Sequence, residues 1–205
     1  FAAYLGVNQA VSTMNGTSAL HLALKVLGVS FDDLVIMPNV TFVASANAIS
    51  YLGAEPVLID IDQNSWQMDL ELLESYLENN CISRDGKLFD KKSSRKIAAI
   101  MIVHVQGNIC DMSKLKKITE KYRIPLVEDA AEALGSKYNG QNAGTIADIG
   151  CYSFNGNKII STGGGGMVVA KEQQLIDKLK HLSTTAKTDP LRYYHDEVGY
   201  NYRLV

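Results

Sequence analysis

Ile149-Gly-Cys-Tyr-Ser-Phe154 is a short apolar run that leads into Asn155-Gly-Asn-Lys158, and four consecutive glycines, Gly163 to Gly166, follow shortly after. The run predicts a buried strand, and the turn places Lys158 just beyond the end of that strand. Glycines allow backbone or a ligand to approach closely. A lysine withdrawn from water loses its proton more readily and becomes a nucleophile toward carbonyls. A solvated turn lysine is the alternative, because most lysines lie on protein surfaces.

Apolar runs of the same kind alternate with helical patterns along the rest of the chain. Strands are predicted at Ala10–Met14, Leu34–Met37, Pro56–Asp60, Ala98–His104, Pro125–Glu128, Ile149–Phe154 and Gly166–Ala170. Helical periodicity covers Thr17–Leu27, Phe42–Leu52, Leu70–Asn79, Met112–Tyr122 and Glu172–Leu182. This alternation predicts an α/β fold, a three-layer αβα sandwich around a mostly parallel sheet of seven strands. Ligands bind such sheets beyond the carboxyl ends of the strands. We interpret the polar stretch Ser83–Arg95 as an exposed insertion.

Composition excludes several classes of function. The chain has 205 residues, 46% of them apolar and 20% charged, with a net charge of −2. That profile is typical of a globular domain and predicts no binding to nucleic acid or to an anionic membrane. No apolar run is long enough to span a membrane. The three cysteines are far apart and odd in number, which indicates a reducing compartment and predicts a cytoplasmic protein. Neither they nor the four histidines have metal-site spacing, so no metal site is predicted.

Asn15-Gly-Thr-Ser18 follows a predicted strand and opens a helix. Thr17 or Ser18 can cap that helix, and its free N–H groups would point toward the strand ends. Such an end stabilises a phosphate through its amides and its dipole. An ordinary capped helix is the alternative, because Ser and Thr caps are common.

Asp129 and Glu132 stand at the end of another predicted strand. A carboxylate there can bind a protonated ring nitrogen, and both acids would line one side of a site if a helical turn begins at this point. A solvated acid or a helix cap is the alternative. Phe42 begins the helix after the second strand and can stack on a flat ring, with core packing as its alternative. Together with Lys158 and the helix end at Thr17, these groups meet the requirements of pyridoxal phosphate. This cofactor needs a lysine for its Schiff base, an acid for its ring nitrogen and a site for its phosphate.

Five motifs, in this order, carry a resemblance to a known family. They are Asn15-Gly-Thr-Ser-Ala-Leu20, Val127-Glu-Asp-Ala-Ala-Glu-Ala-Leu-Gly-Ser136, Tyr152-Ser-Phe-Asn-Gly-Asn-Lys158, Thr162-Gly-Gly-Gly-Gly-Met167 and Gly199-Tyr-Asn-Tyr-Arg203. From about residue 1 to 205 the chain resembles the DegT/StrS-type nucleotide-sugar aminotransferases, which have the fold-type-I pyridoxal-phosphate architecture. It is most similar to the branch of the legionaminic-acid pathway, a comparison carried by Phe154–Lys158, His181–Lys187 and His195–Arg203.

The resemblance implies roles for individual residues. Lys158 would be the catalytic Schiff-base lysine and later the proton shuttle, and Asp129 would pair with the pyridinium nitrogen. Glu132 would sit near the cofactor's phenol oxygen, where many relatives have glutamine or histidine. An anion there would repel a phenolate unless a proton is shared. Phe42 would stack on the ring.

Further residues would complete the site. Thr17, Ser18 and Ser153 would hold the phosphate, and Asn201 would reach the phosphate of the neighbouring subunit, because active sites of this family lie at a homodimer interface. The implied reaction moves an amino group from L-glutamate to C4 of a nucleotide-linked 4-keto-6-deoxy sugar, a UDP-4-keto-6-deoxy-N-acetylhexosamine in the branch named above, for surface-polysaccharide biosynthesis.

Two other hypotheses stay open. Some relatives are sugar dehydratases of the same fold that carry histidine at the lysine position, and lysine at 158 argues against that activity. The chain also opens inside an apparent helix and stops without a cap. We therefore expect residues 1–205 to be the cofactor-binding large domain, without an N-terminal segment and a smaller C-terminal domain. An inactive remnant with an interaction role is the corresponding alternative.

Overall fold

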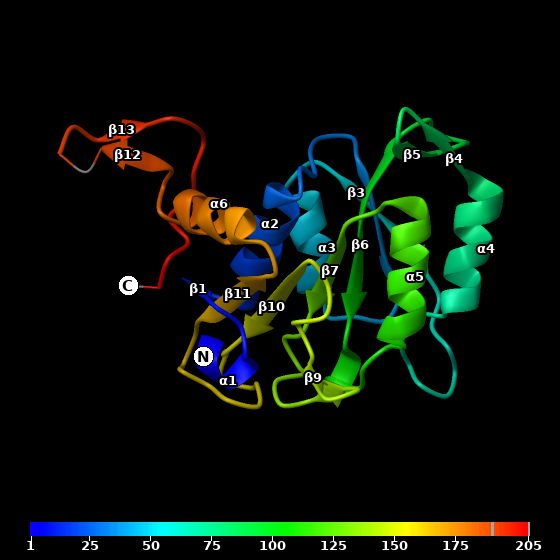
Figure 1. Cartoon of the computed structure of the whole chain (residues 1–205), viewed down its shortest axis with the longest axis horizontal. Coiled ribbons are helices and arrows are strands. Elements are labelled where there is room, and N and C mark those ends of the chain that lie inside the picture. Colours follow the sequence, from blue (N-terminus) through cyan, green and yellow to red (C-terminus); the bar gives the residue numbers. More distant parts are fainter. Residues whose placement is uncertain (190, 205) are drawn as a thin grey trace.

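A computed structural model describes residues 1–189 and 191–204, and its central element is a β-sheet covered by helices on both faces (Figure 1). The main path of the sheet runs through β1 (Val11–Thr13), β11 (Gly166–Ala170), β10 (Ile149–Ser153), β7 (Leu126–Asp129), β6 (Lys96–Val103), β2 (Leu34–Pro38) and β3 (Glu55–Ile59). β11 is antiparallel to both of its neighbours, and the other pairs along the path are parallel. The predicted seven-stranded, mostly parallel sheet is therefore confirmed.

A hairpin extends the sheet beyond these seven strands and corrects the interpretation of the polar stretch 83–95. β4 (Cys81–Arg84) pairs with β5 (Lys87–Asp90), and β5 pairs with β6, which makes a nine-stranded sheet. Leu88 and Asp90 are buried, and the Asp90 carboxylate accepts hydrogen bonds from Ser93 and from the Tyr76 hydroxyl. The segment alternates between buried and exposed residues, as a strand does, but one of its buried positions is the charged Asp90. The sequence therefore does not show a clear alternation of apolar and polar residues.

Helices form the outer layers of the sandwich. α2 (Gly16–Val26), α3 (Val43–Ser50) and α6 (Gln173–Ser183) share one core cluster with the side chains of Val35 and Met37 in β2. α4 (Leu70–Asn80) and α5 (Met112–Tyr122) share another with Leu34 and Ile36 of the same strand. Successive side chains of a strand point to opposite faces, so the two clusters lie on opposite sides of the sheet, as a three-layer αβα sandwich requires. Among the described residues, no helix has both the length and the apolar character needed to cross a membrane.

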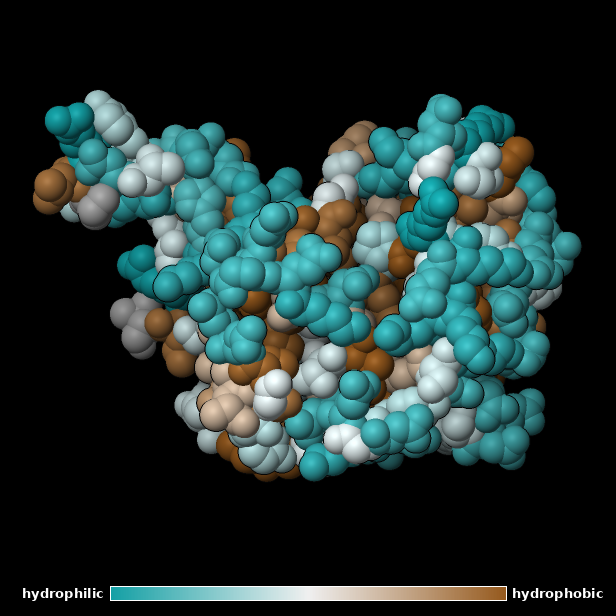
Figure 2. Space-filling view, in the orientation of Figure 1, coloured by the Kyte–Doolittle hydropathy of each residue, from teal (hydrophilic) through white to brown (hydrophobic). Residues whose placement is uncertain are grey.

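Short elements complete the fold. They are α1 (Ala2–Leu5), the 3-10 turn η1 (Val105–Gly107), β8 (Lys137–Tyr138) and β9 (Gln141–Asn142). β12 (Lys187–Asp189) and β13 (Tyr194–His195) pair with each other as a two-stranded arm that projects from the body (Figures 1 and 2). Leu191, between the two strands, is 88% exposed. The arm therefore presents apolar surface away from either core.

Candidate active site

A cavity of about 310 Å³ lies where the carboxyl ends of β6, β7 and β10 meet the N-terminus of α2. Its walls include six of the residues predicted from the sequence, namely Thr17, Phe42, Asp129, Glu132, Ser153 and Lys158. Each comes from a segment that directly follows or ends a strand, so the parallel sheet brings together positions far apart in the chain. The volume is at the lower end of the range of about 300–1,000 Å³ typical of small-ligand pockets.

Lys158 occupies the wall of this cavity rather than open solvent. Its backbone N–H closes a turn to the Asn155 carbonyl, and only 13% of its side chain is exposed. The Nζ atom lies 3.2 Å from Glu132 Oε1 and 5.8 Å from the centre of the Phe42 ring. The interpretation of Lys158 as a solvated turn residue therefore does not describe this structure. Its amine is held between a carboxylate and an aromatic face.

Glu132 is fixed from two sides. Its Oε2 atom accepts a hydrogen bond from the Gln106 N–H at 2.9 Å, and its Oε1 atom receives Lys158. Burial raises the pKa of Glu132, but the Gln106 N–H and the Lys158 ammonium together outweigh burial and lower it. The carboxylate is therefore ionised at neutral pH, with a cation directly beside it.

Asp129, at the end of β7, forms the buried floor of the cavity. Its Oδ2 atom accepts a hydrogen bond of 2.7 Å from the Ser45 hydroxyl of α3, and its Oδ1 atom accepts one from the Ala131 N–H. Burial nevertheless dominates and raises the pKa of Asp129, although both donors and the nearby Lys158 lower it. A cationic N–H in the cavity would stabilise the ionised carboxylate, so the site favours a protonated nitrogen at this point.

The N-terminus of α2 is capped by Asn15, which corrects the expectation that Thr17 or Ser18 is the cap. Asn15 has an extended backbone, and its Oδ1 atom accepts the Ser18 N–H at 2.8 Å. Gly16 and Thr17, whose N–H groups have no partners within a helix, line the cavity instead. A Cβ at Gly16 would lie 2.8 Å from the Ser153 Cβ, so glycine allows the helix end to approach β10 closely. Thr17 and Ser153 are thus brought together in a cradle suited to a phosphate.

Two predicted residues lie outside the cavity wall. Ser18 is buried, and its N–H is already bonded to Asn15. Asn201 is exposed and forms an isolated backbone bridge with Thr184 near the base of the arm. The role expected of Asn201 concerns a neighbouring subunit and stays a prediction.

A buried pair that we did not predict supports the floor of the cavity. His104, at the end of β6, lines the cavity, and its Nε2 atom lies 2.9 Å from Glu128 Oε2, with both side chains fully buried. Glu128 also accepts N–H groups from the 144–147 loop, namely those of Gly144, Ile146 and Ala147. A carboxylate only accepts, so His104 donates through Nε2. The signal available from the sequence was an acid inside an apolar strand run.

The loop that surrounds Glu128 depends on glycine. A Cβ at Gly150 would lie 1.8 Å from the Gly144 carbonyl oxygen, so only glycine at this position of β10 lets the loop cross the strand. Burial raises the pKa of Glu128, but the hydrogen bond from His104 and the N–H groups of the loop outweigh burial and lower it. The ionised carboxylate holds the His104 ring in one orientation under the cavity.

The residues of the cavity fit pyridoxal phosphate. The α2 amides and Ser153 offer a phosphate cradle, the buried Asp129 suits a protonated ring nitrogen, and Lys158 offers an amine within the same walls. Phe42 is 69% exposed, which leaves its ring surface free to cover a flat ligand. The fold and this cavity define a fold-type-I pyridoxal-phosphate-dependent transferase.

The chain belongs to the DegT/DnrJ/EryC1/StrS aminotransferase family, whose profile matches residues 1–205. It is 42% identical over 204 residues to a GDP-perosamine synthase of Escherichia coli O157:H7, and the match covers 100% of this chain and 52% of that protein. It is 38% identical to a UDP-4-amino-4,6-dideoxy-N-acetyl-beta-L-altrosamine transaminase of Campylobacter jejuni subsp. jejuni serotype O:23/36, covering 98% of this chain and 50% of that one.

A solved structure of a related protein has a similar fold. DesV of S. venezuelae, in complex with a ketimine intermediate, has a TM-score of 0.85 and 31% identity, and the match covers 99% of this chain and 50% of that one. The resemblance and the pyridoxal-phosphate cofactor inferred from the sequence are therefore confirmed. The chain spans about half the length of the curated relatives that it matches.

Proposed function

We propose that the protein transfers an amino group from L-glutamate to C4 of a nucleotide-linked 4-keto-6-deoxy sugar, with pyridoxal phosphate as cofactor. The observation that carries the proposal is the placement of Lys158 Nζ inside the cavity, 3.2 Å from Glu132 and within the walls that Asp129 and the end of α2 also form. The names of relatives support a sugar that is linked to a nucleotide. They differ between GDP and UDP, so the proposal extends to both bases, with a UDP-linked N-acetylhexosamine as the first substrate to test.

Pyridoxal phosphate, when bound, supplies an electron sink that makes a proton on the neighbouring carbon removable. Lys158 Nζ is the base that removes the proton from Cα of glutamate and later returns a proton to C4 of the sugar. Glu132 carries the negative charge that balances the lysine while it is protonated. Asp129 accepts a hydrogen bond from the protonated ring nitrogen and keeps that proton in place, with Ser45 fixing the orientation of the carboxylate.

The remaining residues bind and exclude water. The N–H groups of Gly16 and Thr17, with Ser153 as a further donor, would hold the phosphate, and Phe42 would cover the ring. Ser18, which lies outside the cavity wall, would support this helix end through its N–H bond to Asn15. In this proposal, residues 1–205 act as the cofactor-binding large domain, and Asn201 serves the phosphate of a second subunit in a homodimer. The reaction would occur in the cytoplasm, where the buried cysteines stay reduced.

The test is a steady-state assay of the full-length protein with L-glutamate and a panel of GDP- and UDP-linked 4-keto sugars. Lys158→Ala and Lys158→Arg are expected to abolish formation of the amino sugar and to remove the visible absorbance of the cofactor-bound lysine. Lys137→Ala, a change at an exposed lysine of β8, is the matched control and should retain both signals.

Three outcomes would contradict the proposal. A fully active Lys158→Ala enzyme would exclude Lys158 as the base. Formation of a deoxygenated keto sugar instead of an amino sugar would indicate the dehydratase activity. A folded full-length protein that takes up no pyridoxal phosphate, even with borohydride trapping, would favour the remnant without enzymatic activity.

A further inference from the structure

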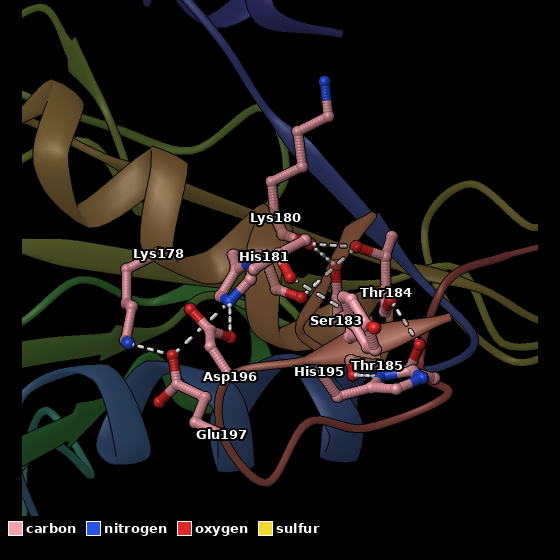
Figure 3. A network of polar contacts seen from close by, with 11 residues as sticks. Lys178, Lys180, His181, Ser183, Thr184, Thr185, His195, Asp196 and Glu197 are labelled. Carbon is pink, nitrogen blue, oxygen red and sulfur yellow. Dashed lines mark hydrogen bonds and ion pairs between the residues drawn. The ribbon is translucent and has the colours of Figure 1, made fainter. Parts of the chain in front are cut away.

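Three side chains of types that can ligate a metal converge at the base of the arm (Figure 3), and none of them lines the cavity. His181 lies in the last turn of α6, and Asp196 and Glu197 directly follow β13. Within the described residues, no other group of three histidine, cysteine or acidic side chains has its ligand atoms so close together. The spacing of these residues in the sequence does not reveal the group, because the arm lies between its members. We call this group the His181 cluster.

The geometry of the cluster approaches that of a metal site. His181 Nε2 lies 2.7 Å from Asp196 Oδ1 and 3.5 Å from Glu197 Oε1, and all three ligand atoms lie within 4.8 Å of one another. Two ligands of a tetrahedral zinc ion, each at about 2.0–2.2 Å, are separated by roughly 3.3–3.6 Å. Of the three pairs of ligand atoms, His181–Glu197 already has that separation and His181–Asp196 needs a side-chain movement of less than an ångström. The Asp196–Glu197 pair lies within 4.8 Å.

The electrostatics of the cluster also favour a cation. Asp196 and Glu197 both present a carboxylate oxygen to His181 Nε2, at 2.7 Å and 3.5 Å. The Glu197 carboxylate lies on the same side of the imidazole. His181 Nε2 points at the Asp196 carboxylate, so the negative charge of Glu197 is only partly balanced by His181. The Lys178 ammonium, one turn earlier on α6, pairs with Glu197 and occupies the place where a cation would be favourable.

We propose that His181, Asp196 and Glu197 bind a divalent transition-metal ion of the zinc class. One imidazole and two carboxylates are the donors that zinc, cobalt and nickel accept, whereas calcium and magnesium prefer oxygen ligands alone. The metal binds His181 Nε2 and displaces the proton there to solvent, and in the metal-bound state the neutral ring carries its proton on Nδ1. On metal binding, the Lys178 side chain leaves Glu197 and adopts a rotamer that points into solvent. Three protein ligands leave at least one coordination position for water.

A metal at this point would tie the start and the end of the arm together. His181 precedes the arm and Asp196 follows it, and the bridge between Thr184 and Asn201 lies next to the cluster in the chain. Binding would therefore restrain the segment that carries Asn201. The consequence for catalysis rests on the proposed function, which assigns Asn201 to a neighbouring subunit, but the binding of metal does not.

The test uses the full-length, cofactor-loaded protein, freed of metal with a chelator and titrated with Zn²⁺ in a calorimeter. One zinc ion per chain is expected, together with a rise in Tm. His181→Asn and Asp196→Asn should each weaken zinc binding by about 10–100-fold or more, as changes around metal ligands do. Lys178→Gln should strengthen it, because the competing ammonium is removed.

His195→Asn is the matched control. The Nδ1 atom of His195 donates a hydrogen bond to the Thr185 carbonyl, and His195 is not a member of the His181 cluster. The His195→Asn variant should therefore bind zinc as the unaltered protein does. Absence of zinc binding in the unaltered protein would overturn the proposal, as would zinc binding that survives in both His181→Asn and Asp196→Asn. Amino transfer measured on the same preparations keeps the two proposals separate, because an unaltered protein that binds no zinc but transfers the amino group contradicts only the metal site.

Discussion

Replacement of Glu128 by glutamine tests the hydrogen-bond arrangement under the cavity. The carboxylate accepts Ile146 and Ala147 N–H groups on Oε1, and the Gly144 N–H and His104 Nε2 on Oε2. In Glu128→Gln, one of these oxygens becomes an NH₂ group, which donates. The least damaging rotamer keeps the carbonyl oxygen at the two loop amides and turns the NH₂ group toward Gly144 and His104.

The cost follows from the donors that remain. His104 can change tautomer and accept from the new NH₂ group, but the Gly144 N–H cannot and is left unsatisfied. An unsatisfied buried N–H costs about 1–3 kcal/mol, and each of the two bonds that lose charge assistance weakens by about 0.5–1 kcal/mol. Removing a buried charge offsets part of this loss. The net decrease in the free energy of unfolding is therefore about 2–4 kcal/mol.

Urea unfolding of the cofactor-free protein, followed by circular dichroism, measures this difference. Glu120→Gln, a change at an exposed position of α5, is the matched control and should shift stability by less than about 0.5 kcal/mol. A Glu128→Gln protein as stable as this control would refute the assignment of Glu128 as an ionised carboxylate saturated with donors.

The pH dependence supplies a second check. His104 and the loop amides hold the pKa of Glu128 below its ordinary value, against the opposing effect of burial. The folded-state pKa is thus lower than the unfolded one, which is about 4.3. The stability contributed by Glu128 is present above that pH and is lost as the pH falls through the folded pKa. The difference in stability between the unaltered protein and Glu128→Gln should therefore narrow in acid.

Three further changes test the cavity itself. Ser45→Ala removes the hydroxyl that donates to Asp129 and should lower kcat/KM by about 10–150-fold, since such a bond contributes about 1.5–3 kcal/mol, with no comparable change for a surface serine. Gly16→Ala places a Cβ 2.8 Å from the Cβ of Ser153 and should weaken cofactor retention, measured by dialysis, at a stability cost of about 1–3 kcal/mol. Asn15→Ala removes the cap of α2 and should reduce the free energy of unfolding by about 0.5–2 kcal/mol in urea, whereas an unchanged midpoint would exclude the cap.

The central strands β2, β6, β7 and β10 could be predicted because they are buried on both faces and appear as apolar runs. The hairpin β4–β5 could not, because Lys87 and its charged neighbours face solvent at the edge of the sheet, where charge is favourable. The cap of α2 was assigned to the wrong residue because cap preference alone does not distinguish Asn15 from Thr17. The geometry that decides it is the extended backbone of Asn15.

The candidate site could be predicted where a single residue follows a strand, as Asp129 and Lys158 do. Side chains that contact one another, such as His104 and Glu128, could not be predicted in the same way. Their contact depends on how the fold brings distant segments of the chain together. His104 reaches Glu128 from the adjacent strand, and no periodicity links the two positions. Family resemblance supplied the assignment of roles, which the residues alone left open.

The position of β1 in the sheet has a consequence for synthesis of the chain on the ribosome. β1 pairs with β11 alone in the sheet, and Thr13 lies opposite Gly166. About 150 residues therefore separate the emergence of the two strands, an interval of about 8–30 s at usual rates of translation. Until then, the first strand lacks its pairing partner in the sheet, and the end of α2 to which we assign the phosphate follows an unpaired strand. Under the proposed function, the nascent protein therefore cannot capture its cofactor until the segment that carries Lys158 has emerged.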